Sequence, residues 1–292
     1  MLKNFHTVGL IGRQRKEDIS DTLEALKTLL QANKLAVVVE EETATFFGAG
    51  KLTSYPRAEL GKHCDLIIVV GGDGSLLSAA RAGIEHQTPV LGINRGRLGF
   101  LTDINPNEIT NKVAAVLNGN YIEEKRFLLD VHIQRDTQKI APDIALNDVV
   151  LLPGDVAHMI EFSITINDQF VCNHRADGMI VATPTGSTAY ALSGGGPILH
   201  PSLDAVVLVP MFPHTLSARP IVIDASSEIK INIAGTNEKP PRLSCDGQSP
   251  IEIPLGASIH IHKKSKTLRL IHPTDYNYFE TLRLKLGWNT KL

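Results

Sequence analysis

The organisation of this 292-residue chain follows from the stretch Asp65-Leu66-Ile67-Ile68-Val69-Val70-Gly71-Gly72-Asp73-Gly74-Ser75. Residues 66–70 are an unbroken apolar run, which is typical of a strand buried on both faces of a parallel sheet. Three glycines around one aspartate follow, and glycine allows a sharp turn and a close approach of a ligand to the main chain. Helix-forming residues begin at Ser75, so the stretch predicts a strand, a glycine turn and a helix.

The glycine turn is suited to bind a phosphate. Successive backbone amides at such a turn form an anion site, and the start of a helix favours negative charge. Gly71, Gly72 and Gly74 are therefore the candidate phosphate contacts. A carboxylate repels a phosphate unless a metal ion or a reacting hydroxyl lies between them, so Asp73 is a candidate acid–base or metal-orienting group in phosphoryl transfer. The alternative is a tight turn with a capping aspartate, and Gly-Gly-Asp-Gly alone does not separate the two.

Composition excludes several classes of function. Hydrophobic residues make up 43% of the chain, charged residues 21%, and the formal net charge is −2, so we expect no nucleic-acid partner and no membrane partner. No apolar run has the length of a membrane span, and residues 1–6 lack a signal-peptide core. The three cysteines are far apart and match neither a disulfide framework nor a zinc site. We expect a cytoplasmic protein.

Histidines do not indicate a metal centre. The chain has 11 of them, and His260 and His262 alternate on a predicted strand, so they share one face. No cysteine or carboxylate cluster lies near them in sequence, and we expect a solvated strand face.

The order of the predicted elements indicates two domains. Strands alternate with helices over residues 1–120, which predicts an α/β domain with a doubly wound parallel sheet. Ligands of such sheets bind beyond the carboxyl ends of the strands, where the glycine turn lies. Within this domain, 40–55 has little periodicity and is expected to be a loop. Asn105-Pro106 is expected to begin a helix.

Alternating patterns dominate residues 121–273 and predict a β-rich second domain, with a hairpin turn at Asn167-Asp168. Residues 274–292 are the C-terminal tail. A helix is expected over 276–286, and we expect it to pack back on the first domain through Tyr276, Phe279, Leu282 and Leu286.

Residues 173–196 are the second informative stretch. The apolar run Met179–Ala182 continues into Thr183-Pro184-Thr185-Gly186-Ser187-Thr188, which offers four hydroxyls and a glycine turn to the polar edges of a ligand. Tyr190 offers a flat surface for a base. The alternative is helix capping by Ser and Thr, with Arg175 and Asp177 as an ion pair.

Two strings about a hundred residues apart carry a family resemblance. Asp-Leu-Ile-Ile-Val-Val-Gly-Gly-Asp-Gly, together with Asp-Gly-Met-Ile-Val-Ala-Thr-Pro-Thr-Gly-Ser-Thr-Ala-Tyr, strongly resembles the NAD kinase family. Residues 94–101, Asn147-Asp148 and 244–248 also sit where that family has similar segments, and the likeness extends to Leu286-Gly287-Trp288. Lipid kinases and phosphofructokinase-like enzymes share Gly-Gly-Asp-Gly, whereas the second string is much more specific.

The resemblance implies transfer of the γ-phosphoryl group of ATP to the adenosine ribose 2′-hydroxyl of NAD, with a divalent cation, Mg²⁺ or Mn²⁺. The sequence does not identify the ligands of that cation. The resemblance also implies an α/β domain followed by a β-sandwich-like domain, and assembly as a homodimer or homotetramer. Two other functions stay open: a non-catalytic NAD- or NADP-binding sensor, and a kinase of the same loop type acting on a lipid or sugar.

The resemblance also assigns site residues. Asp73 matches the general base, whose carboxylate must meet a nucleotide cradle built from the second half of the chain. The expected NAD contacts are Asp73, Gly74, Asn147, Asp148, His158, Arg175, Asp177, Thr188, Ala189, Tyr190, Ala191, Leu192, Ser193 and Gln248. Position 148 is Asp where many members have Glu, which shortens its reach to the ribose. Position 75 is Ser where many members have Thr or Asn; a hydroxyl is kept there, so we expect this change to be tolerated.

Overall fold

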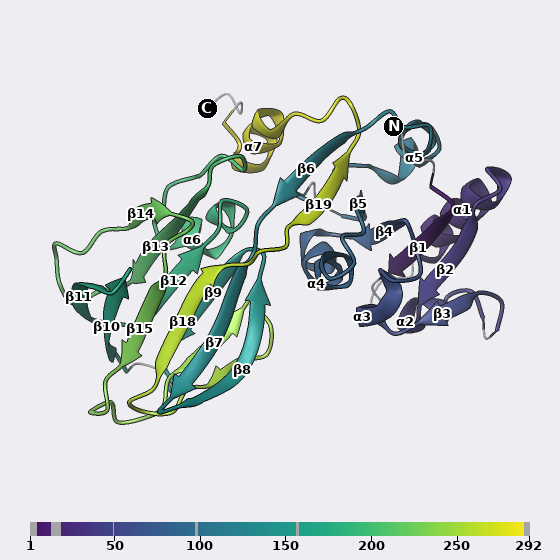
Figure 1. Cartoon of the computed structure of the whole chain (residues 1–292). Helices are drawn as coiled ribbons and strands as arrows, with labels where there is room; N and C mark the ends of the chain where they lie inside the picture. Colours follow the sequence, from purple (N-terminus) through teal and green to yellow (C-terminus); the bar gives the residue numbers. More distant parts are fainter. Residues whose placement is uncertain (1–4, 13–18, 49, 97–98, 156–157, 289–292) are drawn as a thin grey trace. The chain divides into compact units, whose positions relative to one another are not determined.

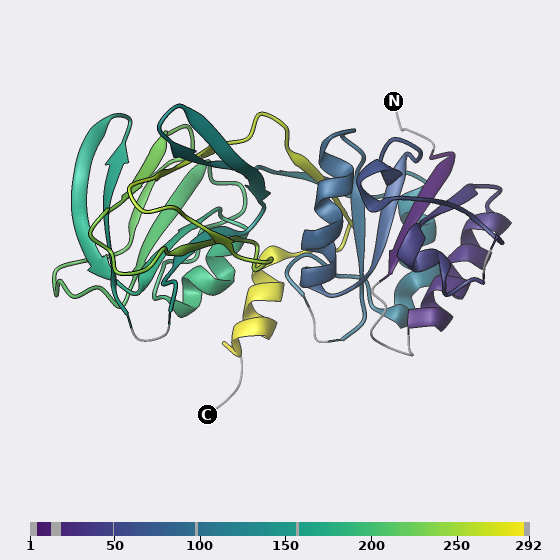
Figure 2. The ribbon, with the colours of Figure 1, turned by 90° about the horizontal axis from the view of Figure 1, so that it is seen from below.

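The computed structural model describes residues 5–12, 19–48, 50–96, 99–155 and 158–288. The chain forms two compact units (Figure 1). The first comprises residues 1–125 and 266–292, and the second comprises residues 126–265, so the second is inserted into the chain of the first. Figure 2 shows their contrast from a second direction: helices accompany the strands of the first unit, whereas strands make up nearly all of the second.

A seven-stranded sheet in the order β3-β2-β1-β4-β5-β19-β6 forms the centre of the first unit. The pairs from β3 to β19 are parallel, as the alternation of strands and helices predicts. Strand β19 and strand β6 come from residues that we expected in the second domain. The strands are β1 (Thr7–Gly12), β2 (Ala36–Glu40), β3 (Thr53–Tyr55), β4 (Leu66–Gly71), β5 (Val90–Asn94), β6 (Ile122–Arg126) and β19 (Leu268–His272).

Helices cover both faces of this sheet. Leu66, Ile68 and Val70 of β4 share one apolar core with residues of helices α1 and α5. Helix α4 contacts the same strand without entering that core, so it covers the other face. All residues of 66–70 are fully buried, which confirms the predicted central strand. The helices are α1 (Ile19–Ala32), α2 (Glu41–Ala44), α3 (Arg57–Leu60), α4 (Asp73–Ile84), a 3₁₀ turn (Pro106–Glu108), α5 (Ile109–Leu117) and α7 (Tyr278–Leu286).

The second unit is a β-sandwich of two six-stranded antiparallel sheets. Their orders are β11-β10-β15-β18-β7-β8 and β14-β13-β12-β9-β16-β17, and one apolar core takes residues from both. The strands are β7 (Leu129–Arg135), β8 (Gln138–Ala145), β9 (Asp148–Leu152), β10 (Ile160–Ile166), β11 (Gln169–Ala176), β12 (Gly178–Ala182), β13 (Ala205–Met211), β14 (Ile221–Asp224), β15 (Ile229–Ile233), β16 (Arg242–Cys245), β17 (Ile251–Glu252) and β18 (Ser258–Lys263). After β12 come a 3₁₀ turn (Gly186–Thr188) and α6 (Tyr190–Ser193).

Several local predictions are confirmed. Asn105 begins a helical segment with a capping box to Glu108, and proline takes the first position. Asn167 and Asp168 both have positive φ at the turn between β10 and β11, as a tight hairpin requires.

Two local predictions are only partly right. Residues 40–55 contain α2 and the edge strand β3, which are one turn and three residues long and too short to produce a periodic pattern. The C-terminal helix, which belongs to the first unit, buries Thr281 and Leu282. Phe279, expected on the packed face, is 57% exposed.

Candidate active site

The Asp73 carboxylate is held by a neighbouring segment of the first unit. Asp73 is the first residue of α4, and its Oδ2 accepts a hydrogen bond from the backbone N–H of Phe100 at 2.8 Å. Its Oδ1 accepts one from the backbone N–H of Leu101 at 3.0 Å and one from Thr102 Oγ1 at 3.4 Å. The helix begins after Gly72 with no side-chain cap, so the alternative of a capping aspartate is wrong.

This grip leaves one place for a further hydrogen bond. A carboxylate oxygen has two lone pairs, and both on Oδ1 are used. Oδ2 accepts only one hydrogen bond among the described residues and keeps one lone pair. Gly99 makes the close approach possible, because a Cβ at that position would lie 2.1 Å from Asp73 Oδ1.

The three predicted phosphate contacts surround the start of α4. Gly71 ends β4, Gly72 precedes the helix, and Gly74 is exposed in the first turn. A Cβ at Gly72 would meet nothing within 4 Å, so the turn is open on that side. Amides in the first turn of a helix lack partners within the helix and attract an anion.

In the second unit, Asp148 lies beside a second carboxylate. Asp148 begins β9 and is 5% exposed. The pKa of its carboxyl is raised from 3.8 to about 7, first by burial and second by the charge of Asp246, while a hydrogen bond from the Tyr190 backbone amide acts in the opposite direction. Asp246 instead receives the amides: its Oδ2 accepts from Leu146 at 2.9 Å, and its Oδ1 accepts from Asn147 at 2.7 Å and from Asp148 at 3.3 Å.

Asn147 presents an unused acceptor next to this pair. Its Oδ1 is buried and has no hydrogen-bond partner among the described residues. Its backbone oxygen accepts from the Thr183 amide at 2.9 Å, and Gly186 fits against it because a Cβ there would lie 2.1 Å from that oxygen. A buried acceptor without a partner is rare in folded proteins, and a bound ligand is one way to satisfy it.

The four hydroxyls of residues 183–188 serve the protein itself. Thr183 Oγ1 donates to the Leu146 carbonyl at 2.5 Å, and Ser187 Oγ donates to the Pro184 carbonyl at 2.7 Å. Thr185 Oγ1 accepts from Arg126 at 3.4 Å, and Thr188 Oγ1 donates to the Thr185 carbonyl at 3.3 Å. Thr183, Thr185 and Ser187 are buried, so they fix the turn after β12 and leave Thr188 as the accessible member.

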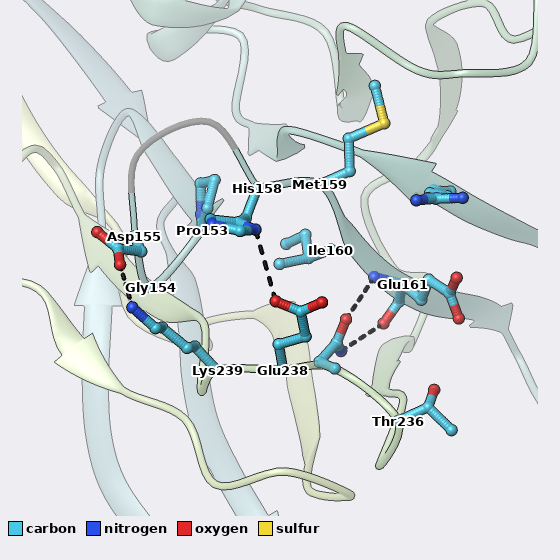
Figure 3. Close-up of a pocket in the computed structure, with 12 residues that line it drawn as sticks. Pro153, Gly154, Asp155, His158, Met159, Ile160, Glu161, Thr236, Glu238 and Lys239 are labelled. Carbon is cyan, nitrogen blue, oxygen red and sulfur yellow. Dashed lines mark hydrogen bonds and ion pairs between the residues drawn. The ribbon is translucent and has the colours of Figure 1, made fainter.

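Two cavities of the second unit share one wall and gather four of the predicted NAD contacts. A cavity of about 600 Å³ is lined by His158, Asp177 and Tyr190, together with Phe212 and Arg242. The other, of about 420 Å³, is lined by Arg175 and by His158, which Figure 3 shows next to Glu238. His158 Nδ1 lies 3.7 Å from Glu238 Oε2. Arg175 and Asp177 form no ion pair with each other in the part of the chain that the structure describes.

The remaining predicted contacts lie on or beside α6 and on the loop after β16. The side chain of Ala191 belongs to an apolar core, whereas Leu192 is half-buried and Ser193 is exposed. Ala189 precedes the helix. Gln248 is exposed, and its backbone carbonyl accepts from Ser244 Oγ at 2.8 Å.

Sequence reasoning missed the residues that hold the two key carboxylates in place. Gly99 and Thr102 position Asp73, and Asp246 organises the amides around Asp148. Asp246 lies within the segment 244–248 of the resemblance, and Gly99 lies within 94–101, so the segments were recognised but the roles were not.

No cluster of three His, Cys, Asp or Glu side chains suited to a metal ion occurs in the described ranges. Mg²⁺ usually keeps several waters and binds one or two carboxylates plus substrate phosphates. No helix of the described residues is long and apolar enough to cross a membrane.

Comparisons with known proteins agree on one family. The model of the ATP-NAD kinase N-terminal domain matches residues 8–121, and that of the C-terminal domain matches residues 146–273. The NAD kinase of Coxiella burnetii is 55% identical over 288 residues, covering 99% of this chain and 96% of the relative. The NAD kinase of Pseudomonas fluorescens is 54% identical over 291 residues, covering 100% and 98%.

Two solved structures have the same fold. The crystal structure of yeast NADH kinase complexed with NADH has a TM-score of 0.90 and 26% identity, covering 99% of this chain and 90% of that one. An NAD kinase from Archaeoglobus fulgidus in complex with ATP has a TM-score of 0.72 and 24% identity, covering 96% and 97%. With both family domains matched in order and relatives more than half identical along nearly the whole chain, this chain belongs to the ATP-NAD kinase family.

Proposed function

We propose that the chain transfers the γ-phosphoryl group of ATP to the adenosine ribose 2′-hydroxyl of NAD and produces NADP and ADP. The observation that carries this proposal is the Asp73 carboxylate, which is fixed at the start of α4 and has one Oδ2 lone pair that the described residues do not use. Family membership identifies the acceptor as the ribose of a dinucleotide rather than a lipid or a free sugar.

The reaction is an in-line displacement. The 2′-oxygen forms a bond to the γ-phosphorus, the bond from that phosphorus to the β,γ-bridging oxygen breaks, and the hydroxyl proton passes to Asp73 Oδ2. Aspartate is a weak base for an alcohol, so Asp73 first orients the hydroxyl and takes the proton late in a loose transition state. The open amides around Gly72 and Gly74 neutralise charge on the phosphates.

In the second unit, we assign the dinucleotide contacts to the residues around Asp148 and the two cavities. The Asn147 Oδ1 acceptor and the Asp148 carboxylate are the candidate partners of ribose hydroxyls. Tyr190, which is 45% exposed at a cavity wall, offers its ring to a base. His158, Arg175, Asp177, Thr188, Ala189, Ala191, Leu192, Ser193 and Gln248 complete the proposed set.

The divalent cation, Mg²⁺ or Mn²⁺, is proposed to arrive bound to ATP as part of the substrate. Carried in this way, it needs no protein cage and shields the phosphates from the Asp73 carboxylate. We further propose a homodimer or homotetramer, which sedimentation velocity of the full chain would distinguish from a monomer.

The test is incubation of the purified chain with NAD, Mg²⁺ and either ATP or polyphosphate, with NADP measured through an NADP-specific dehydrogenase. NADH replaces NAD in a parallel reaction to define the acceptor. We expect NADP formation that depends on ATP and Mg²⁺. Tight NAD binding without any turnover would indicate a sensor instead, and phosphorylation of a lipid or sugar in place of NAD would indicate another kinase class.

A further inference from the structure

His272 is a buried histidine of the first unit that the proposed mechanism does not use. It ends β19 and is 1% exposed. Its Nδ1 lies 2.9 Å from Asp103 Oδ2, its Nε2 lies 3.6 Å from Glu124 Oε2 of β6, and its ring stacks on Tyr276 at 3.9 Å. Two carboxylates and one aromatic ring thus face the imidazole, and this environment stabilises its protonated, positively charged form.

Burial by itself lowers the pKa of His272, but the hydrogen bond to Asp103 and the nearby carboxylate of Glu124 outweigh it, so the pKa lies above its ordinary value. Asp103 depends on this partner. Its side chain is 12% exposed, and its Oδ1 accepts no hydrogen bond among the described residues. Removing the imidazole would leave a largely buried carboxylate without its cation, which is strongly unfavourable.

The partner of His272 lies within the segment that grips Asp73. Residues 100–102 donate the three hydrogen bonds to the Asp73 carboxylate, and Asp103 follows directly. Ile104 then bridges to Ile93 of β5, and its carbonyl accepts from the Asn94 amide at 2.8 Å. The backbone bridge at 104 and the ion pair at 103 therefore both hold the end of this segment to the sheet.

We infer that His272 is a positioning residue for phosphoryl transfer: through Asp103 it fixes the segment 99–104, whose amides and Thr102 hydroxyl aim the Asp73 carboxylate. The inference rests on the proposed role of Asp73. Catalysis by orientation is sensitive to displacement, and a shift of about 1 Å can cost on the order of 10²-fold in rate. A loosened segment would change the aim of Asp73 without removing any group that contacts NAD or ATP.

The test compares His272→Gln with Arg269→Gln in the full chain. Arg269 lies on the same strand and makes a bidentate pair with Glu123 of β6, at 2.6 Å for both contacts, but it does not touch the segment 99–104. Both variants should unfold at a lower temperature. We expect H272Q to lower kcat about tenfold with unchanged KM for NAD and ATP, and R269Q to keep kcat. Normal kcat in H272Q, or equal losses in both variants, would overturn the inference.

A double-mutant cycle with Asp73→Asn separates this inference from the proposed function. If His272 acts through Asp73, H272Q should change kcat by less than about twofold in the D73N background. A full further loss would show an independent effect and refute the inference, and normal kcat in D73N alone would refute the proposed role of Asp73. The proposed function itself would be refuted only if the parent chain formed no NADP. If H272Q does not fold, Asp103→Asn takes its place in the cycle, because it keeps the shape of the pair and removes the negative charge. The same outcomes then support or refute the inference.

Discussion

Asp73 of the first unit and Asp148 of the second differ in how their carboxylates are satisfied. Three donors from residues 100–102 hold Asp73. Near Asp148, the backbone amides of Leu146 and Asn147 donate to Asp246 instead. Asp148 accepts a hydrogen bond from the Tyr190 amide and lies next to the negative charge of Asp246. The hydrogen bonds to Asp73 fix the direction in which its carboxylate points, whereas the surroundings of Asp148 set the pH at which its carboxyl group ionises. Changes at Asp73 should therefore act on rate, and changes at Asp148 on affinity and its pH dependence.

The largest expected effect is that of Asp73→Asn. The amide keeps the size of the side chain but cannot accept the hydroxyl proton, so kcat should fall by roughly 10²–10⁴-fold with NAD affinity unchanged. Asp65→Asn is the matched control: Asp65 precedes β4, and its Oδ2 accepts the amides of His6 at 2.8 Å and Thr7 at 3.0 Å. That variant should lose stability and keep kcat. Comparable losses of kcat in the two variants would contradict a chemical role for Asp73.

Gly99→Ala tests whether the orientation of the Asp73 carboxylate matters, because it leaves that carboxylate in place. The new Cβ would lie 2.1 Å from Asp73 Oδ1, so the carboxylate or the segment must move. We expect kcat to fall by up to about a hundredfold, with little change in KM for NAD. Gly235→Ala is the control, since a Cβ there meets nothing within 4 Å. Unchanged kcat in G99A would show that the exact aim of Asp73 is unimportant.

Asp148→Ala tests affinity in the second unit. If Asp148 accepts hydrogen bonds from ribose hydroxyls, its charge also opposes a 2′-phosphate, so the variant should weaken NAD by about tenfold and NADP less. Calorimetric titration of both nucleotides measures the difference. Asp224→Ala, which changes an aspartate on β14, should leave both affinities as they are. Equal losses of affinity for NAD and NADP in D148A would show that Asp148 does not bind the ribose hydroxyls.

The smallest expected effect is on pH dependence. The pKa of Asp148 is raised to about 7, so its carboxylate forms as pH rises through about 7, and NAD should bind several-fold more tightly at pH 8 than at pH 6. Because the folded-state pKa is raised, the folded protein holds the extra proton from about pH 4 to 7, and unfolding free energy falls as pH rises through that window. Asp148→Asn should flatten both profiles. A pH-independent NAD affinity in the parent protein would contradict this ionisation.

Side-chain patterns predicted the framework of both units and the location of Asp73. The apolar run 66–70 predicted a buried strand, and the alternation over 121–273 predicted a β-rich domain. The sandwich form was implied by the family resemblance, and strands β6 and β19 from that range belong to the first unit. These patterns did not reveal contacts made by backbone donors or by residues that are far apart in the sequence. The amides of Phe100 and Leu101 that hold Asp73 carry no residue signature, and Gly99 shows its purpose only once Asp73 lies beside it. The pairing of His272 with Asp103 spans 169 positions, beyond any local pattern.

We propose that the Asp73 carboxylate of the first unit determines the rate of phosphoryl transfer, whereas the Asp148 carboxylate of the second unit determines the affinity for NAD. Rapid-quench single turnovers with labelled ATP and saturating NAD at pH 8 test this directly in Asp73→Asn and Asp148→Ala. We expect a transfer rate at least about a hundredfold slower in D73N, and a rate within a few-fold of the parent in D148A. Near-parental transfer in D73N, or a collapse of transfer in D148A at saturating NAD, would contradict it.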